Sequence, residues 1–154
     1  MNTLGLRLRK YDPDPEEGDG FDYLVVEIKV DGEPLVDFNY YATDLSAMHQ
    51  SIKERGEWGI VTCWCGDMGC AGLKQGIHVR HEDERIFWKI NEPGPRRAFA
   101  FDKEQVMSEI KMLPKQANGL IKYLGEWSTG QIKIVPDFNE GYFDLSSDHN
   151  RPKT

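Results

Sequence analysis

The sequence lacks a long apolar segment. No stretch approaches the run of about 20 apolar residues that a membrane-spanning helix needs. The first twelve residues, MNTLGLRLRKYD, alternate Leu with Gly or Arg and do not form the apolar centre of a signal peptide. We therefore expect a cytoplasmic protein that makes no contact with a membrane.

The sequence also lacks an excess of positive charge. It contains 19 Lys and Arg against 26 Asp and Glu, for a net charge of −7. The whole excess lies before residue 63, because residues 1–62 contain 6 basic and 13 acidic residues. Sequence-independent affinity for nucleic acid comes from Lys and Arg that neutralise phosphates. The charge distribution therefore predicts no nucleic-acid partner and favours a basic protein as the partner.

The common nucleotide-binding and hydrolase motifs are absent. The sequence contains no G-x-x-x-x-G-K-[ST], no G-x-G-x-x-G after a strand and no G-x-S-x-G. Its four histidines, at positions 49, 78, 81 and 148, are scattered. These absences favour a protein without catalytic activity, and an enzyme with a cysteine or metal centre remains the alternative.

The apolar pattern predicts an α+β fold with one domain over residues 1–145 and a flexible tail over 146–154. Asp31-Gly32 between two β-rich runs indicates a hairpin, because a type I′ turn needs positive φ at both central positions. We expect a mainly antiparallel sheet of about six strands, with a short helix and a longer helix broken at Pro114 on one face. Strands are predicted over 4–11, 21–30, 34–41, 59–65, 77–90 as a pair about HEDE, 99–101 and 131–135, and helices over 44–56 and 102–125.

All three cysteines of the chain, Cys63, Cys65 and Cys70, lie within a span of eight residues. On a strand over 59–65, Cys63 and Cys65 share one face. The first interpretation is that these small apolar thiols fill the core, because cysteine is among the most buried residue types. The second is a zinc site, since zinc binds four sulfur or nitrogen atoms. Its fourth ligand would be His78 or His81, and His78 is favoured because it lies on the next predicted strand. A Cys65–Cys70 disulfide and a reactive thiolate remain further alternatives, so the expected cofactor is either none or zinc.

Two resemblances accompany this segment. The spacing in CWCGDMGCAGL resembles the zinc-binding post-SET segment of lysine methyltransferases, and this resemblance implies a ligand geometry without the methyltransferase activity. Over most of its length the chain also resembles small uncharacterised bacterial proteins with a TC-x-CG…GC-x-G centre. The matching residues are Thr62, Cys63, Cys65, Gly66, Gly69, Cys70, Gly72, Trp88, Phe99, Phe101 and Asp102. This second resemblance implies no established activity, although small acidic bacterial proteins of this kind include immunity proteins that neutralise toxins.

The segment DPDPEEGDG, residues 12–20, is the most acidic part of the chain. It is not an EF-hand loop, because the sixth position, which must be Gly, is Glu17. We expect an exposed loop, and charge complementarity makes it a candidate docking site for a basic partner. Its candidate residues are Asp12, Asp14, Glu16, Glu17 and Asp19.

These observations together favour a non-catalytic protein-binding protein. The most concrete form of this hypothesis is an immunity-type protein that covers a basic toxin. A zinc-stabilised structural module and an enzyme with a cysteine or metal centre are the alternatives.

Overall fold

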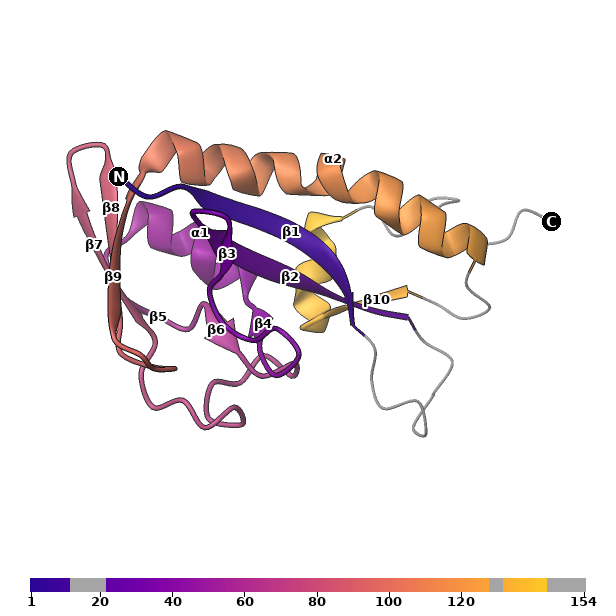
Figure 1. Cartoon of the computed structure of the whole chain (residues 1–154), viewed down its shortest axis with the longest axis horizontal. Helices are drawn as coiled ribbons and strands as arrows, with labels where there is room; N and C mark the ends of the chain where they lie inside the picture. Colours follow the sequence, from indigo (N-terminus) through magenta and orange to yellow (C-terminus); the bar gives the residue numbers. More distant parts are fainter. Residues whose placement is uncertain (12–21, 128–131, 144–154) are drawn as a thin grey trace.

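The computed structural model describes residues 1–11, 22–127 and 132–143, except for the side chains of residues 11 and 122–127 (Figure 1). The predicted acidic loop, residues 12–20, and the predicted tail, residues 146–154, lie outside these described residues. The predicted end of the domain at residue 145 lies outside them as well.

The first sheet is built on β2 (Asp22–Val30). β1 (Leu4–Tyr11) pairs with it antiparallel over its whole length, and β10 (Ile132–Val135) pairs parallel with its other edge. The alternation of LGLRLR buries Leu4, Leu6 and Leu8 under the long C-terminal helix, which lies along β1 in Figure 1. Residues 24–28 of β2 are all buried, so elements pack on both faces of this central strand.

The turn after β2 confirms the predicted hairpin. Asp31 and Gly32 have φ values of 53° and 85°, as a type I′ turn requires. The returning strand is shorter than the predicted 34–41, because β3 consists only of Glu33–Pro34. Asp37 then turns the chain away from the sheet: its side chain accepts a hydrogen bond from the Asn39 N–H at 3.0 Å, and its carbonyl accepts one from the Tyr40 N–H at 3.0 Å.

Helix α1 (Leu45–Lys53) begins where the sequence predicts. The carboxylate of Asp44 accepts a hydrogen bond from the Ala47 N–H at 2.9 Å, which is the usual N-cap contact. Leu45, Met48 and Ile52 form the buried stripe of the helix. The predicted start and buried stripe are therefore confirmed, whereas the helix ends at Lys53 and not near Gly56, which begins the next strand.

A second four-stranded sheet is antiparallel throughout. Its strand order is β5 (Gly56–Trp58), β7 (Ile77–Glu82), β8 (Arg85–Ile90) and β9 (Arg97–Asp102). The charged turn HEDE joins β7 to β8, and Asp83 in this turn has φ of 54°. Ile86, Trp88 and Ile90 of β8 point into the core, where the Trp88 and Phe101 ring centroids are 5.0 Å apart. On the other face of this sheet, Arg80, Arg85 and Lys89 are exposed among the described residues.

A third sheet has two strands, and the cysteines follow directly after its second strand. β4 (Ala42–Thr43) pairs with β6 (Val61–Thr62). The predicted strand over 59–65 is therefore wrong at both ends, because β6 covers only residues 61–62 and the chain turns at Cys63. The cysteines belong to a loop.

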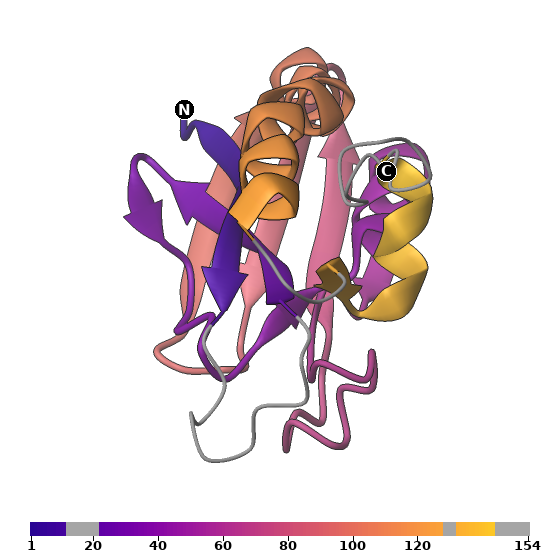
Figure 2. The same cartoon turned by 90° about the vertical axis from the view of Figure 1, so that its right-hand side faces the viewer.

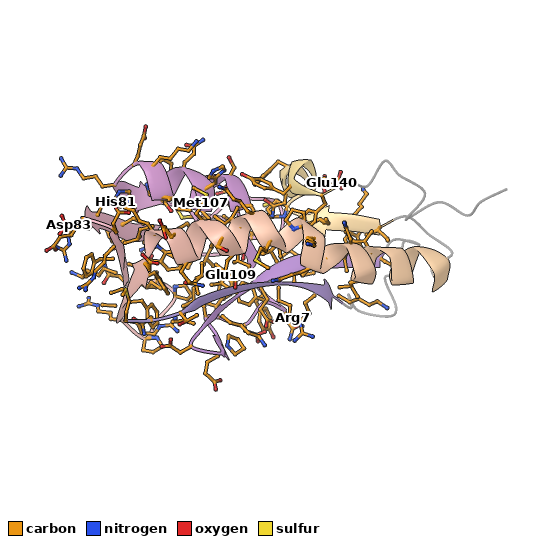
Figure 3. All side chains as sticks on the ribbon, turned by 90° about the horizontal axis from the view of Figure 1, so that it is seen from above. Arg7, His81, Asp83, Met107, Glu109 and Glu140 are labelled. Atoms are coloured by element: carbon orange, nitrogen blue, oxygen red, sulfur yellow. The ribbon has the colours of Figure 1, made fainter. Side chains whose placement is uncertain are left out.

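Helix α2 (Lys103–Trp127) runs through Pro114 without the predicted break. Val106, Ile110 and Leu113 before the proline and Ala117 and Ile121 after it are all buried. Burial of this stripe on both sides of Pro114 outweighs the lost backbone hydrogen bond. Leu120 is half-buried, and the side chain of Leu124 lies outside the described residues. Figure 3 shows Arg7 of β1 and Glu140 of the 3-10 helix η2 (Asp137–Tyr142) on opposite sides of α2.

The predicted fold class is confirmed. The described chain combines α-helices with mainly antiparallel strands, and its buried apolar side chains form one cluster. The strands form three sheets within the described residues, whereas the sequence predicted one sheet of about six strands. No described helix has both the length and the apolar character needed to cross a lipid bilayer.

Candidate metal centre

The cysteine loop, residues 63–73, joins β6 to the segment before β7. It lies on the side of the molecule opposite to α2 (Figures 1 and 2). Backbone hydrogen bonds fold it tightly: the Gly66 N–H donates to the Cys63 carbonyl at 2.8 Å, the Cys63 N–H to the Asp67 carbonyl at 3.1 Å, and the Leu73 N–H to the Met68 carbonyl at 2.9 Å. The loop is therefore a folded local structure with its own turns.

Gly66 is needed for this path of the chain. Its φ is +91°, a conformation that L side chains rarely adopt. A Cβ atom on Gly66 would also lie 2.6 Å from Cε1 of Phe138, so the ring of Phe138 packs directly over the glycine. This contact ties the cysteine loop to η2.

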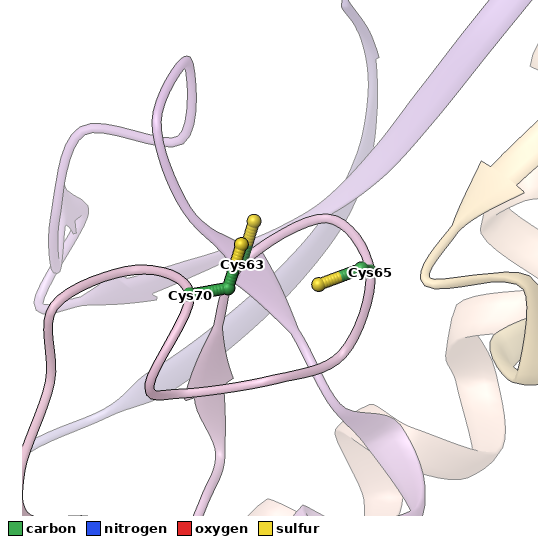
Figure 4. Close-up of side chains that lie close together, drawn as sticks. All are labelled: Cys63, Cys65 and Cys70. Atoms are coloured by element: carbon green, nitrogen blue, oxygen red, sulfur yellow. The ribbon is translucent and has the colours of Figure 1, made fainter.

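The loop brings the three cysteine sulfur atoms together, within 4.8 Å of one another (Figure 4). All three are free thiols; Cys63 is half-buried, and Cys65 and Cys70 are exposed. The interpretation as core-filling thiols is therefore wrong. It failed because it placed Cys63 and Cys65 on a strand, whereas the turn after β6 carries them out to the surface.

The pKa values of Cys63 and Cys70 are shifted in opposite directions. The pKa of Cys63 is lowered, chiefly because the backbone N–H of Cys65 hydrogen-bonds to its sulfur. Hydrogen bonding to Cys63, followed by Cys65, raises the pKa of Cys70 to about 11. This arrangement favours a thiolate at Cys63 and a protonated thiol at Cys70.

This spacing suits a tetrahedral metal ion. With Zn–S bonds of about 2.3 Å, sulfur ligands on zinc lie about 3.8 Å apart. The three sulfur atoms lie within 4.8 Å of one another, so each sulfur–sulfur distance must shorten by about 1 Å at most to match zinc. A side-chain rotation is large enough for this change. Exposed side chains such as Cys65 and Cys70 are free to make that adjustment. Thiolates also select zinc and other soft metals over magnesium or calcium.

His78, the expected fourth ligand, is not part of this group. It lies on β7 between Glu57 of β5 and Lys89 of β8, and its Nε2 is 3.2 Å from Oε1 of Gln75. Among the described residues no further His, Asp or Glu joins the three sulfurs. The described chain therefore offers three potential ligands for a metal ion.

The two other described histidines have structural contacts. His81 hydrogen-bonds through Nε2 to the carbonyl of Ser51 at 2.7 Å, and the ring of His49 lies edge-on to Tyr142 with centroids 6.4 Å apart. The docking residues predicted in the acidic loop, Asp12, Asp14, Glu16, Glu17 and Asp19, lie outside the described residues. Their part in docking stays a prediction.

A large hollow, which the sequence analysis missed, lies on the open face of the second sheet. Its volume is about 1210 Å³, and none of the cysteines lines it. The signal was in the alternation of β7 and β8, which places Arg80, Phe87 and Lys89 opposite the buried residues Val79 and Trp88. The alternation that predicts these strands also predicts a polar face on each of them.

Comparisons of the chain with protein-family models, with curated proteins and with solved structures found no match. The resemblances to post-SET segments and to small bacterial proteins stay predictions. The case for a function rests on the geometry of this chain alone.

Proposed function

We propose that this protein is a non-catalytic protein-binding domain whose cysteine loop holds one zinc ion. The observation that carries the proposal is the gathering of the Cys63, Cys65 and Cys70 sulfur atoms within 4.8 Å at the surface. Three thiols this close, with one pKa lowered and no disulfide between them, form a ligand set that zinc binds well.

The position of the loop supports a structural role for the ion. The loop begins at β6 of the two-stranded sheet and leads to β7 of the second four-stranded sheet, while Phe138 packs on Gly66 from η2. An ion held by all three cysteines would fix the loop between these elements. The large hollow lies away from the cysteines, which is evidence against a substrate site built around them.

The exposure of the loop supports a role in binding. Zinc prefers four ligands, and the described chain supplies three, so the fourth position is left for water or for a side chain of a partner. The acidic excess in residues 1–62 favours a basic partner. An immunity-type protein that covers a basic toxin is the concrete form of this proposal.

Metal analysis of protein purified without chelator tests the zinc site. We expect one zinc ion per chain, and after exchange with cobalt(II) the sulfur-to-metal charge-transfer absorption of a thiolate site. Cys65→Ser should lower metal affinity and also stability by several kcal/mol, because metal binding is linked to folding. His78→Ala is the matched variant, and it should leave the stoichiometry and the cobalt spectrum unchanged if the three cysteines are the protein ligands.

Two outcomes would contradict the proposal in different ways. Protein that contains no zinc and takes none up from a zinc-buffered solution would remove the metal site altogether. A loss of affinity in His78→Ala equal to that in Cys65→Ser would instead show that β7 supplies the fourth ligand.

A further inference from the structure

The hollow on the second sheet is strongly cationic although the chain is acidic. Five basic side chains line it against one carboxylate, that of Glu57. Arg80, Lys89 and Arg97 lie on β7, β8 and β9, and Arg55 and Arg96 lie one residue before β5 and β9. A net charge of −7 for the whole chain makes this local reversal of sign notable.

Most of this positive charge is not neutralised within the described chain. Arg80 pairs with Glu82 at 3.2 Å, and Arg97 donates to the carbonyls of Leu35 and Pro95. Arg55, Lys89 and Arg96 form no ion pair with any described residue. The Glu57 carboxylate is itself engaged, because its Oε1 accepts a hydrogen bond from the Gly76 N–H at 2.7 Å.

The floor of the hollow is apolar, and part of it is formed by small side chains. Phe87 stands opposite Ala100, and Lys89 stands opposite Ala98, so the two alanines of β9 leave space beside the larger residues of β8. The edge of β9 at Ala100 is already covered, because Asn2 exchanges hydrogen bonds with the Ala100 backbone at 2.7 and 2.9 Å. At this point a ligand must lie on the sheet face and cannot add as a strand at the edge.

We propose that this face binds an acidic segment of a partner polypeptide. Carboxylates of the segment would pair with Arg55, Lys89 and Arg96, and its apolar side chains would lie on Phe87 and on the alanines of β9. The proposal is independent of the zinc site, because different strands and side chains form the two sites. It assigns to the chain a second surface whose charge is opposite to that of the acidic loop.

The aromatic side chains argue against single-stranded nucleic acid as the ligand. Binding of that kind stacks bases on free aromatic faces. The guanidinium carbon of Arg80 lies 4.4 Å from the centroid of the Phe87 ring and already covers one of its faces. The negative charge over the rest of the molecule would also repel a long polyanion.

The binding of a labelled peptide tests the proposal. The probe is a fluorescein-labelled peptide of three Glu-Glu-Leu repeats, measured by anisotropy at low ionic strength, where the Debye length is about 30 Å. The control peptide has Gln in place of every Glu. We expect the wild-type chain to bind the acidic peptide at least about tenfold more tightly than the control peptide.

Two pairs of charge reversals locate the binding. Lys89→Glu with Arg96→Glu should weaken binding of the acidic peptide at least about tenfold. Lys111→Glu with Lys115→Glu, on an exposed part of α2, makes the same change of charge and should weaken it less than about twofold. Ala98→Phe fills the floor without a change of charge and should also weaken binding. Thermal unfolding of each variant shows that the fold is intact.

The proposal would be overturned by equal losses in the two double variants, since this would indicate attraction to the overall charge. It would also be overturned if the wild-type chain failed to prefer the acidic peptide to the Gln control. Tighter binding of a ten-nucleotide dT oligomer, lost in the Lys89 and Arg96 variant, would assign the face to nucleic acid instead.

Discussion

The side chain of Gln105 makes two hydrogen bonds to the backbone of Leu4, in the place where a neighbouring strand would otherwise pair. The Leu4 N–H donates to Oε1 of Gln105 at 3.0 Å, and Nε2 of Gln105 donates to the Leu4 carbonyl at 2.6 Å. These bonds join the first turn of α2 to the start of β1, in a region that is partly buried. Gln105→Leu leaves both backbone groups unpaired, and we expect it to lower the free energy of unfolding by about 1–3 kcal/mol.

Urea denaturation at equilibrium measures this change. Gln116→Leu makes the same substitution at an exposed position of α2 and should change stability by less than about 0.5 kcal/mol. Equal effects of the two variants would show that water satisfies the Leu4 backbone as well as Gln105 does.

The buried stripe of α2 gives a second prediction. Ile110 is 4% exposed, and Ile110→Ala should lower the free energy of unfolding by about 2–5 kcal/mol through lost burial and the cavity left behind. Met112, two positions along and 48% exposed, is the control, and Met112→Ala should have little effect. A change under about 0.5 kcal/mol for Ile110→Ala would mean that this face of the helix does not pack on the core.

Zinc affinity should depend steeply on pH. The pKa of Cys70 is raised to about 11, so this thiol is protonated near neutral pH and must release its proton when it binds a metal. The apparent affinity should therefore rise at least about tenfold for each pH unit between about pH 6 and 7.5. Competition with a chelator of known pH dependence measures this slope, and an affinity that does not change with pH would exclude Cys70 as a ligand.

The acidic loop gives a prediction about the rate of association with a basic partner. Replacement of Asp14, Glu16, Glu17 and Asp19 by neutral residues should slow association at low salt and change the dissociation rate less, because long-range charge mainly steers encounter. Added salt should reproduce this effect in the wild-type chain as the Debye length falls from about 30 to 8 Å. Stopped-flow mixing measures both rates. An unchanged association rate in the variant would leave the loop without a role in docking.

The strands and helices were largely predictable because their signals are local. The Asp31-Gly32 turn, the Asp44 cap and the alternation of β7 and β8 each depend on a few neighbouring residues. The error at Pro114 arose because the packing that holds α2 together on both sides of the proline depends on β1, which is distant in the sequence. The division of the strands into three sheets depends on similarly distant contacts.

The candidate sites were predictable only in part. The close spacing of the three cysteines makes them a candidate site in the sequence. The exposure of their side chains depends on where β6 ends, and the strand-like pattern over 59–65 does not show that end. His78 was favoured because it lies on the next predicted strand, whereas β7 places its side chain in the hollow on the second sheet. The cationic hollow combines residues from four strands, and no local pattern contains all of them.

The parallel pairing of β10 with β2 has a consequence for the order in which the protein folds during synthesis. Residues 22–25 of β2 pair with residues 132–135, so this edge of the central strand stays uncovered until more than a hundred further residues have been made. An uncovered apolar strand edge is a template for pairing with other chains. A nascent or truncated chain that ends before Ile132 should therefore self-associate through β2, and a chain that includes β10 should cover this edge itself.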